Sequence, residues 1–274
     1  MSRERAVILA RGLGTRMREP NDGTLPPDQA RAAAGGAKAM MPLAVAGGAA
    51  ARPFLDYGLS ALADAGYTDV CLVVAPDHEA MASYYRGPGA PRRIRLDFAV
   101  QEAPIGTANA VAAAADWTGD DPFLVINGDN YYAVRTLASL VGRSGAAAAL
   151  FRADALVARS NIPAERIRAF ALCEVVDGRL VRIVEKPTPE QAAALPEALV
   201  SMTCWRMPPA IHAACRRIAK SVRGEYELAD AVSALIAAGE RIDVVVAQDG
   251  VLDLSRRGDV AAVEQALRGV TVDP

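Results

Sequence analysis

The chain has 274 residues, 30 basic against 32 acidic side chains, a net charge of −2 and 52% apolar residues. Balanced charge without a basic run gives no electrostatic signal for nucleic acid, so we expect no nucleic-acid partner. The first apolar stretch, residues 6–10, is too short for a signal peptide or a membrane span, which predicts a cytoplasmic protein without membrane association. The four cysteines are scattered through apolar segments and are interpreted as buried free thiols.

Short β-rich runs alternate with helical periodicity through the first half of the chain. Strands are predicted at residues 7–10, 70–74, 94–100 and 123–126. Helices are predicted at residues 54–65, near 80–85 and at 107–115. This alternation predicts βαβ units and a mostly parallel sheet.

Residues 12–48 interrupt this pattern. The first strand should turn directly into a helix, but Gly, Pro, Asp and Ala follow without usable periodicity. A connection of this length inside a compact domain is usually an active-site lid or partly disordered. We therefore expect the part from Met17 to Ala37 to be mobile in the free protein, and to close when a nucleotide draws its two ends together.

The elements after Ala146 follow a different order. Strands predicted at 170–176 and 179–184 flank Asp177-Gly178, a strong hairpin signal, so an antiparallel pair is expected there. The remaining predicted elements are a strand at 199–206, a helix near 210–217, an amphipathic helix around 228–236, a strand at 242–247 and a helix near 260–267. No linker or repeat divides the chain, which predicts one domain over residues 1–274.

The segment Gly12-Leu13-Gly14-Thr15-Arg16 follows the first predicted strand. Glycines let the backbone approach a ligand closely, and consecutive amides can cradle phosphate oxygens, with Arg16 adding positive charge. An ordinary glycine turn is the alternative. The segment is not a Walker A loop, and it lacks the third glycine of a dinucleotide fingerprint.

The segment Asn127-Gly128-Asp129-Asn130 follows the strand predicted at 123–126. Asp129 would therefore stand at the carboxyl edge of the sheet, where ligands bind in open α/β folds. Because Mg²⁺ takes one or two carboxylates and then phosphate oxygens, Asp129 is a candidate metal ligand. A polar β-turn without a ligand is the alternative.

The segment from Gln101 to Asn109 follows the third predicted strand and opens a helix. Gln101 offers one donor and one acceptor, the pair that matches N3–H and O4 of uracil or thymine. A Pro-Gly turn with Thr107 as a helix cap explains the same residues without a ligand.

Together with four further segments, these motifs follow one another in a specific order: Gly12–Arg16, Lys38–Pro42, Gln101–Asn109, Gly128–Asn130, Glu185–Pro187, Arg223–Glu225 and Leu252–Asp253. In this order and spacing, over nearly its whole length, the chain resembles the sugar-1-phosphate nucleotidylyltransferases. The likeness is greatest to the glucose-1-phosphate thymidylyl- and uridylyltransferases.

The resemblance implies an α/β, Rossmann-like nucleotidyltransferase fold. Its sheet would be mixed, mostly parallel and flanked by helices, with a small antiparallel insertion on the sugar side. Residues 1–150 would bind the nucleotide and residues 151–274 the sugar phosphate. The implied reaction is Mg²⁺-dependent transfer of a nucleotidyl group from UTP or dTTP to a sugar 1-phosphate, with release of pyrophosphate. Relatives are usually dimers or tetramers, which adds a homo-oligomer to the expectations.

The resemblance also implies roles for individual residues. The implied catalytic residues are Arg16, Lys38 and Asp129. The implied nucleotide-binding residues are Ala10, Gly12, Gly14, Thr15, Gln101, Gly106 and Thr107. The implied sugar-phosphate-binding residues are Asn130, Glu185, Lys186 and Arg223, and the implied Mg²⁺ ligands are Asp129 and Asp253. Because a residue before proline favours an extended backbone, Pro187 is expected to fix Lys186 in that conformation.

Departures from the family leave two rival functions open. Ala10-Arg11 replaces a Gly-Gly pair, and Leu254-Ser255 replaces the Thr-Gly that commonly follows the second aspartate. About a dozen additional residues lie between Arg16 and Lys38. One rival is a non-catalytic nucleotide-sugar sensor on the same fold. The other is a glycosyltransferase of the related GT-A architecture. Such an enzyme would be expected to have an Asp-x-Asp motif where this chain has a single aspartate.

Overall fold

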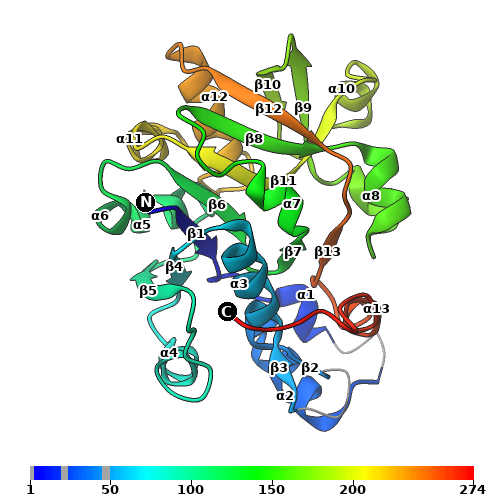
Figure 1. Ribbon diagram of the computed structural model, residues 1–274. Helices are drawn as coiled ribbons and strands as arrows, with labels where there is room; N and C mark the ends of the chain where they lie inside the picture. Colours follow the sequence, from blue (N-terminus) through cyan, green and yellow to red (C-terminus); the bar gives the residue numbers. More distant parts are fainter. Residues whose placement is uncertain (1–2, 20–23, 45–49) are drawn as a thin grey trace.

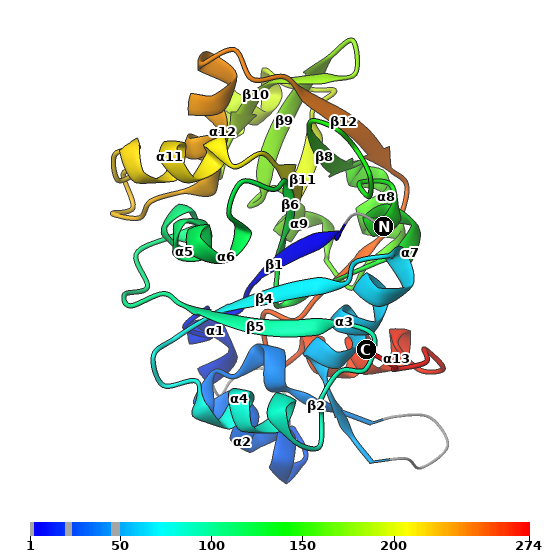
Figure 2. The same ribbon diagram turned by 60° about the vertical axis from the view of Figure 1, so that its left-hand side comes forward.

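The structure, a computed structural model, describes residues 3–19, 24–44 and 50–274. A nine-stranded mixed sheet runs through the molecule in the order β5-β4-β1-β6-β11-β8-β12-β10-β9 (Figures 1 and 2). Helices pack on both of its faces. The α/β class predicted from the sequence is confirmed.

One half of the sheet is parallel. It consists of β1 (Arg5–Leu9), β4 (Asp69–Val74), β5 (Arg95–Val100) and β6 (Phe123–Asn127). Side chains alternate between the two faces of a strand, so Ala6 and Ile8 enter one core cluster and Val7 enters the other. Burial on both faces explains why these strands read as short continuous apolar runs in the sequence.

Different helices cover the two faces. The helices α3 (Phe54–Ala65) and α7 (Val134–Ala138) contribute to the core cluster on one face. On the other face lie α5 (Thr107–Ala113), α11 (Ala210–Arg217) and α12 (Leu228–Ala237). Short connecting helices complete the chain: α4 (Glu79–Arg86), α6 (Ala115–Thr118), α8 (Ala153–Arg159), α9 (Ala164–Ile167) and α10 (Pro189–Ala193).

The other half of the sheet mixes strand directions. The strand β11 (Leu199–Met207) runs antiparallel between β6 and β8 (Ala146–Phe151), and β12 (Ile242–Ala247) is parallel to β8. The predicted hairpin is confirmed as β9 (Ala171–Val176) and β10 (Arg179–Val184). Its turn residues Asp177 and Gly178 have φ of 49° and 72°, as a tight hairpin requires. Because β10 pairs with β12, the hairpin extends the main sheet.

The stretch between Arg16 and Lys38 is more regular than predicted. It contains the end of α1 (Thr15–Arg18) and the whole of α2 (Pro27–Gly35), so the expectation of no periodic structure is wrong for residues 27–35. The helix is alanine-rich and has little amphipathic contrast, which explains why its pattern was missed. Residues 20–23 of this stretch lie outside the described residues.

This stretch is docked onto the body of the protein. Buried Met17 and Ala33 share a core cluster with Val260 and Val263 of α13 (Asp259–Ala266). The glycines on either side of the stretch also meet: a Cβ added to Gly14 would lie 2.3 Å from the carbonyl oxygen of Gly36. The two ends of the stretch therefore lie together in this structure. Mobility of the stretch and its closure over a nucleotide stay predictions.

Two small antiparallel sheets lie outside the main sheet. In one, β2 (Pro42–Leu43) follows the short helix η1 (Lys38–Met40) and pairs with β3 (Arg52–Pro53). In the other, β7 (Asn130–Tyr132) pairs with β13 (Val251–Asp253). This second ladder brings a C-terminal segment to the end of β6.

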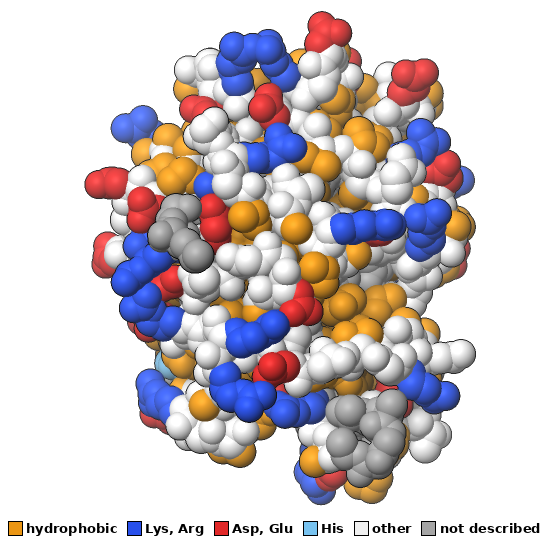
Figure 3. All heavy atoms as spheres, viewed as in Figure 1, with side chains coloured by type: hydrophobic (Ala, Val, Ile, Leu, Met, Phe, Trp, Pro, Cys, Tyr) orange, Lys and Arg blue, Asp and Glu red, His pale blue; other side chains and the backbone are white. Residues whose placement is uncertain are grey.

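Basic and acidic side chains are interspersed on the face shown in Figure 3. This distribution agrees with the balanced composition of the chain. None of the helices within the described ranges combines the length and the apolar character needed to cross a membrane.

Candidate active site

Asp129 and Asp253 lie side by side where β7 and β13 pair. Asp129 directly precedes β7, and Asp253 lies opposite Asn130 in the ladder. The amide of Leu254 donates to the Asp129 carbonyl oxygen (2.9 Å), which fixes the two backbones to each other. The structure thus brings together the two carboxylates that were expected in one centre.

Each of these carboxylates has a cationic partner. Lys38 Nζ lies 2.9 Å from Asp129 Oδ2, and Arg166 of α9 forms an ion pair with Asp253. Ser255 Oγ donates a further hydrogen bond to Asp253 (2.8 Å). Burial, and then the nearby charge of Asp129, raise the pKa of Asp253 above its ordinary value, while Arg166 opposes this shift.

Sequence reasoning missed Arg166, because it belongs to none of the motifs. Asn161 carried a weak signal, since asparagine is scarce in this chain. Its side chain donates to the Asp253 carbonyl oxygen and accepts from the Asp253 amide, both at 2.8 Å. Asn161 therefore holds β13 in place.

The donor set of this carboxylate centre suits Mg²⁺. Within residues 3–19, 24–44 and 50–274, no three or more His, Cys, Asp or Glu side chains gather into a metal-binding group. Mg²⁺ does not need such a group, because one or two carboxylates, water and substrate phosphate complete its shell. Asp129 and Asp253 fit that requirement. An ion there would compete with Lys38 and Arg166 for the carboxylate oxygens.

The two glycines of the loop before α1 have different surroundings. Gly14 has φ of 62° and lies against Gly36, so both its conformation and its packing exclude a side chain. A Cβ on Gly12 would meet nothing within 4 Å among the described residues. Thr15 and Arg16 are exposed beside it. The open backbone for a ligand is therefore at Gly12.

Gln101 is buried at the end of β5, and its amide group is already engaged. Gln101 Nε2 donates to the Gly106 carbonyl oxygen (3.1 Å) and to Asn109 Oδ1 (2.9 Å). Both of its amide hydrogens therefore have partners, and only its acceptor oxygen is left for a base. The side chain of Arg11 donates to the carbonyl oxygens of Gln101 (2.7 Å) and Glu102 (3.2 Å). Arg11, which stands where the family usually has a glycine, therefore holds this segment in place.

Gly106 and Thr107 join this segment to the start of α12. Gly106 has φ of 126°, and a Cβ there would lie 2.3 Å from the Tyr226 carbonyl oxygen. The Tyr226 amide donates to Ile105 O (2.8 Å). Thr107 Oγ1 accepts from the amide of Leu228 (2.9 Å), the first residue of α12. Thr107 therefore does not cap its own helix α5, whose N-cap is Gly106.

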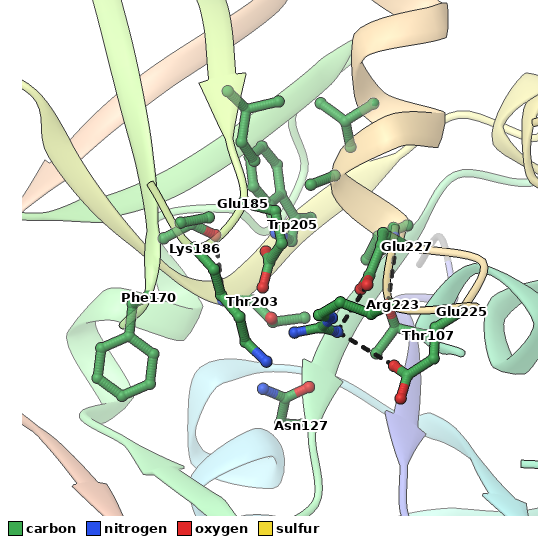
Figure 4. A pocket seen from close by; sticks show the side chains of 16 residues that line it. Thr107, Asn127, Phe170, Glu185, Lys186, Thr203, Trp205, Arg223, Glu225 and Glu227 are labelled. Carbon is green, nitrogen blue, oxygen red and sulfur yellow. Dashed lines mark hydrogen bonds and ion pairs between the residues drawn. The ribbon is translucent and has the colours of Figure 1, made fainter. Parts of the chain in front are cut away.

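A cavity of about 200 Å³ opens beside these segments, between β9–β11 and α12. We call it the acidic pocket because three of its lining residues are glutamates. Its charged lining residues are Glu185, Lys186, Arg223, Glu225 and Glu227. Figure 4 shows Glu185, Lys186 and Arg223 converging on one space, with Asn127 beside Lys186.

Three of the four residues expected on the sugar phosphate thus line one cavity. The fourth, Asn130, lies behind it, and Asn127 connects the two. Asn127 Nδ2 donates to Asn130 Oδ1 (3.2 Å), and Asn130 Nδ2 lies 3.4 Å from Asp253 Oδ1. The acidic pocket and the carboxylate centre are therefore neighbours.

Charge is unevenly compensated in the acidic pocket. Arg223 pairs with Glu227 (2.6 Å) and Glu225 (3.1 Å). Glu185 has no ion pair with any other described residue. Burial, and then the charge of Glu227, raise the pKa of Glu185 to about 7.

The pocket also contains two strained backbone positions. Lys186 has φ of 45° and Thr203 has φ of 57°. The expectation that Pro187 holds Lys186 extended is therefore wrong, because the tertiary structure overrides the local preference. Conformations of this kind cost on the order of 1–3 kcal/mol each and are found mainly at functional sites.

Residues 37–254 match the family described as Nucleotidyl transferase. A glucose-1-phosphate thymidylyltransferase of Streptomyces antibioticus is 33% identical over 270 residues, which are 96% of this chain and 66% of that protein. The enzyme of the same name from Streptomyces griseus is 31% identical over 87% of this chain and 59% of that protein. This chain therefore spans about three-fifths to two-thirds of these relatives. The UTP–glucose-1-phosphate uridylyltransferase AglF of Haloferax volcanii is 28% identical over 97% of both chains.

Solved structures share the fold. A UDP-glucose pyrophosphorylase from Acinetobacter baumanii superposes with a TM-score of 0.72 at 17% identity, over 99% of this chain and 96% of the other. A UDP-glucose pyrophosphorylase complexed with UDP-glucose gives 0.71 over 97% and 98%. The predicted nucleotidyltransferase fold is therefore confirmed.

Proposed function

The chain belongs to the nucleotidyl transferase family, and from this premise we propose that it transfers a nucleotidyl group from UTP or dTTP to a sugar 1-phosphate, releasing pyrophosphate. One observation carries the proposal: Asn127 lines the acidic pocket and donates to Asn130, which lies against Asp253. A sugar phosphate in the pocket would therefore lie next to a carboxylate pair suited to a magnesium triphosphate.

The proposed reaction is an in-line displacement. An oxygen of the sugar phosphate attacks the α-phosphorus of the nucleotide, the bond from that phosphorus to the bridging oxygen breaks, and pyrophosphate leaves with the bond electrons. Because the nucleophile is already an anion at pH 7, no general base is required. The two histidines agree with this: His78 contacts the Ala75 carbonyl oxygen, and His212 is buried beside Thr118.

The chain's own residues would hold two mutually repelling phosphates together. We assign the sugar phosphate to Lys186 and Arg223, and the sugar hydroxyls to Glu185. We assign the triphosphate of the nucleotide to Arg16 and Lys38, and the Mg²⁺ ion to Asp129 and Asp253. Mg²⁺, when bound, supplies positive charge to the phosphate oxygens. Catalysis then consists of positioning and of neutralising the charge that develops on the phosphates.

The experiment that tests the proposal is a matrix of four nucleoside triphosphates against a panel of hexose 1-phosphates with Mg²⁺, read as pyrophosphate release. We expect release only with a pyrimidine nucleotide and a sugar phosphate present together. Nucleotide-sugar binding without release in any combination would favour the sensor, and consumption of a nucleotide sugar without pyrophosphate would favour the glycosyltransferase. Cytoplasmic location and homo-oligomer formation stay predictions.

A further inference from the structure

Thr203 has an unusual backbone conformation at the wall of the acidic pocket. Its φ of 57° lies in a region that β-branched residues rarely adopt. Among the described residues, only two other non-glycine positions have a positive φ. Asp177 lies in the hairpin turn, where this is ordinary, and Lys186 lines the same pocket as Thr203. The unusual positions outside turns therefore gather at the pocket.

The strand around Thr203 is built to hold this conformation. Ser201 pairs with Leu150 of β8 while Trp205 pairs with Ala148, so β11 carries two more residues than its partner across this interval. The extra residues form a bulge, a device that re-aims side chains near active sites.

A buried tyrosine fixes the bulge from behind. The hydroxyl of Tyr132, which is 1% exposed, donates to the Met202 carbonyl oxygen (2.5 Å). The Thr203 carbonyl oxygen lies 3.1 Å from the same hydroxyl, and the Thr203 amide donates to Ser201 Oγ (3.3 Å). The conformation at Thr203 is therefore set by its surroundings and does not depend on the threonine side chain.

Glycine would adopt this conformation without strain, so the presence of threonine needs another reason. Figure 4 shows Thr203 between Lys186 and Arg223, close to Glu185. Its hydroxyl forms no hydrogen bond with another residue of the described ranges. The side chain thus offers an unused donor and acceptor to whatever occupies the pocket.

We propose that Thr203 is a specificity-determining residue, whose hydroxyl hydrogen-bonds a ring hydroxyl of the sugar 1-phosphate. The inference rests on the proposed function, because it takes the occupant to be a sugar phosphate. Lys186 and Arg223 suit its phosphate, and a neutral hydroxyl suits the ring. A site that pairs with a substrate hydroxyl discriminates strongly against analogues that lack or misplace it.

Three substitutions separate the hydroxyl from the backbone strain. Thr203→Ser keeps the hydroxyl, Thr203→Ala removes it, and Thr203→Gly removes both the hydroxyl and the strained Cβ. The probes are α-D-glucose 1-phosphate and its 2- and 4-epimers, mannose and galactose 1-phosphate. For each protein we measure kcat/KM with UTP and dTTP, the Kd of each sugar phosphate by calorimetry, and the Tm.

We expect Thr203→Ser to stay within twofold of the native protein. Thr203→Ala and Thr203→Gly should each weaken the best sugar phosphate roughly 10-fold, in both kcat/KM and Kd, and reduce the preference between epimers. The KM of the nucleotide should not change, and Thr203→Gly should melt above Thr203→Ala, since only glycine relieves the strain. Asp177→Gly is the matched control, because it removes a side chain at positive φ outside the pocket and should leave all kinetic values unchanged.

The outcomes distinguish this inference from the proposed function. Alanine and glycine variants that keep the epimer preference within twofold would overturn the role of Thr203. A native protein that binds the sugar phosphates in the predicted pattern but releases no pyrophosphate would overturn the proposed function alone. A native protein that binds none of the three sugar phosphates would overturn both.

Discussion

The carboxylate centre and the acidic pocket are neighbours built in opposite ways. In the loop before α1, which packs against Gly36 close to Lys38, the positive φ angle falls on Gly14, where it costs little. Both carboxylates of the centre are paired with cations. In the acidic pocket, the positive φ angles fall on Lys186 and Thr203, and Glu185 has no ion pair among the described residues.

This difference indicates that the two regions have different roles: one has paired charges and an unstrained backbone, and the other has the features of a binding site. At the carboxylate centre each carboxylate has a cationic partner, and the backbone angles are permitted ones. The acidic pocket contains two residues with strained backbone angles and a buried carboxylate without an ion pair. Such features make folding less favourable, and they are found mainly at functional sites. Substitutions at the carboxylate centre should therefore act mainly on turnover, and those in the acidic pocket on sugar binding and stability.

The largest effect is expected for Asp129→Asn. The substitution removes one charge of the carboxylate pair, so turnover should fall roughly 100- to 1,000-fold. The fold should survive, because the side chain is partly exposed and its ion pair with Lys38 stabilises by about 1 kcal/mol or less. Pyrophosphate release and thermal unfolding measure the two effects, and Asp253→Asn should also be severe.

Asp120→Asn is the control for this prediction, since it changes an exposed aspartate in the turn before β6. It should leave turnover unchanged. A folded Asp129→Asn protein with near-normal turnover would refute the place of Asp129 in the centre, and with it the contrast between the two regions.

The next effect is the choice of base. The acceptor oxygen of Gln101 is the group left for a base at the end of β5, and we expect it to accept N3–H of uracil or thymine. A mismatched base would leave buried polar groups unpaired. UTP or dTTP should therefore exceed GTP by at least ~100-fold in kcat/KM, about 2.7 kcal/mol. A clear preference for GTP or ATP in the same assay contradicts this assignment.

A smaller effect is expected for Lys186→Ala in the acidic pocket. Loss of one ammonium from the phosphate site should raise the KM of the sugar 1-phosphate about 10-fold, and the KM of the nucleotide much less. Lys220→Ala is the control, because Lys220 lies over the Tyr226 ring and does not line the pocket. Equal changes in both KM values would place Lys186 elsewhere in the mechanism.

The sequence correctly predicted the elements that depend on local periodicity and turn residues. The bounds of α3 agree with the 54–65 prediction, and the turn chemistry of Asp177-Gly178 located the hairpin. The pairing of β7 with β13 was beyond reach, because each strand has three residues and more than a hundred lie between them. Arg166 and Thr203 were missed for a related reason: one acts through an ion pair and the other through a bulge, and both arise only from tertiary packing.

The smallest effect concerns the free protein and tests the uncompensated carboxylate itself. Burial raises the pKa of Glu185 from an ordinary 4.5 to about 7, so between these values the folded protein keeps a proton that the unfolded chain has lost. The contribution of Glu185 to stability therefore falls as pH rises through this window. Glu185→Gln has no such titration. Its free energy of unfolding, relative to the native protein, should rise by about 1 to 2 kcal/mol between pH 5 and pH 8.

Urea unfolding at a series of pH values measures this difference without adding salt that would screen the charges. Glu174→Gln on β9 is the control, because Glu174 lies outside the pocket lining, and its curve should run parallel to that of the native protein. Parallel curves for Glu185→Gln as well would mean that Glu185 is as well solvated as a surface carboxylate. The acidic pocket would then hold no uncompensated charge, and its contrast with the carboxylate centre would rest on backbone strain alone.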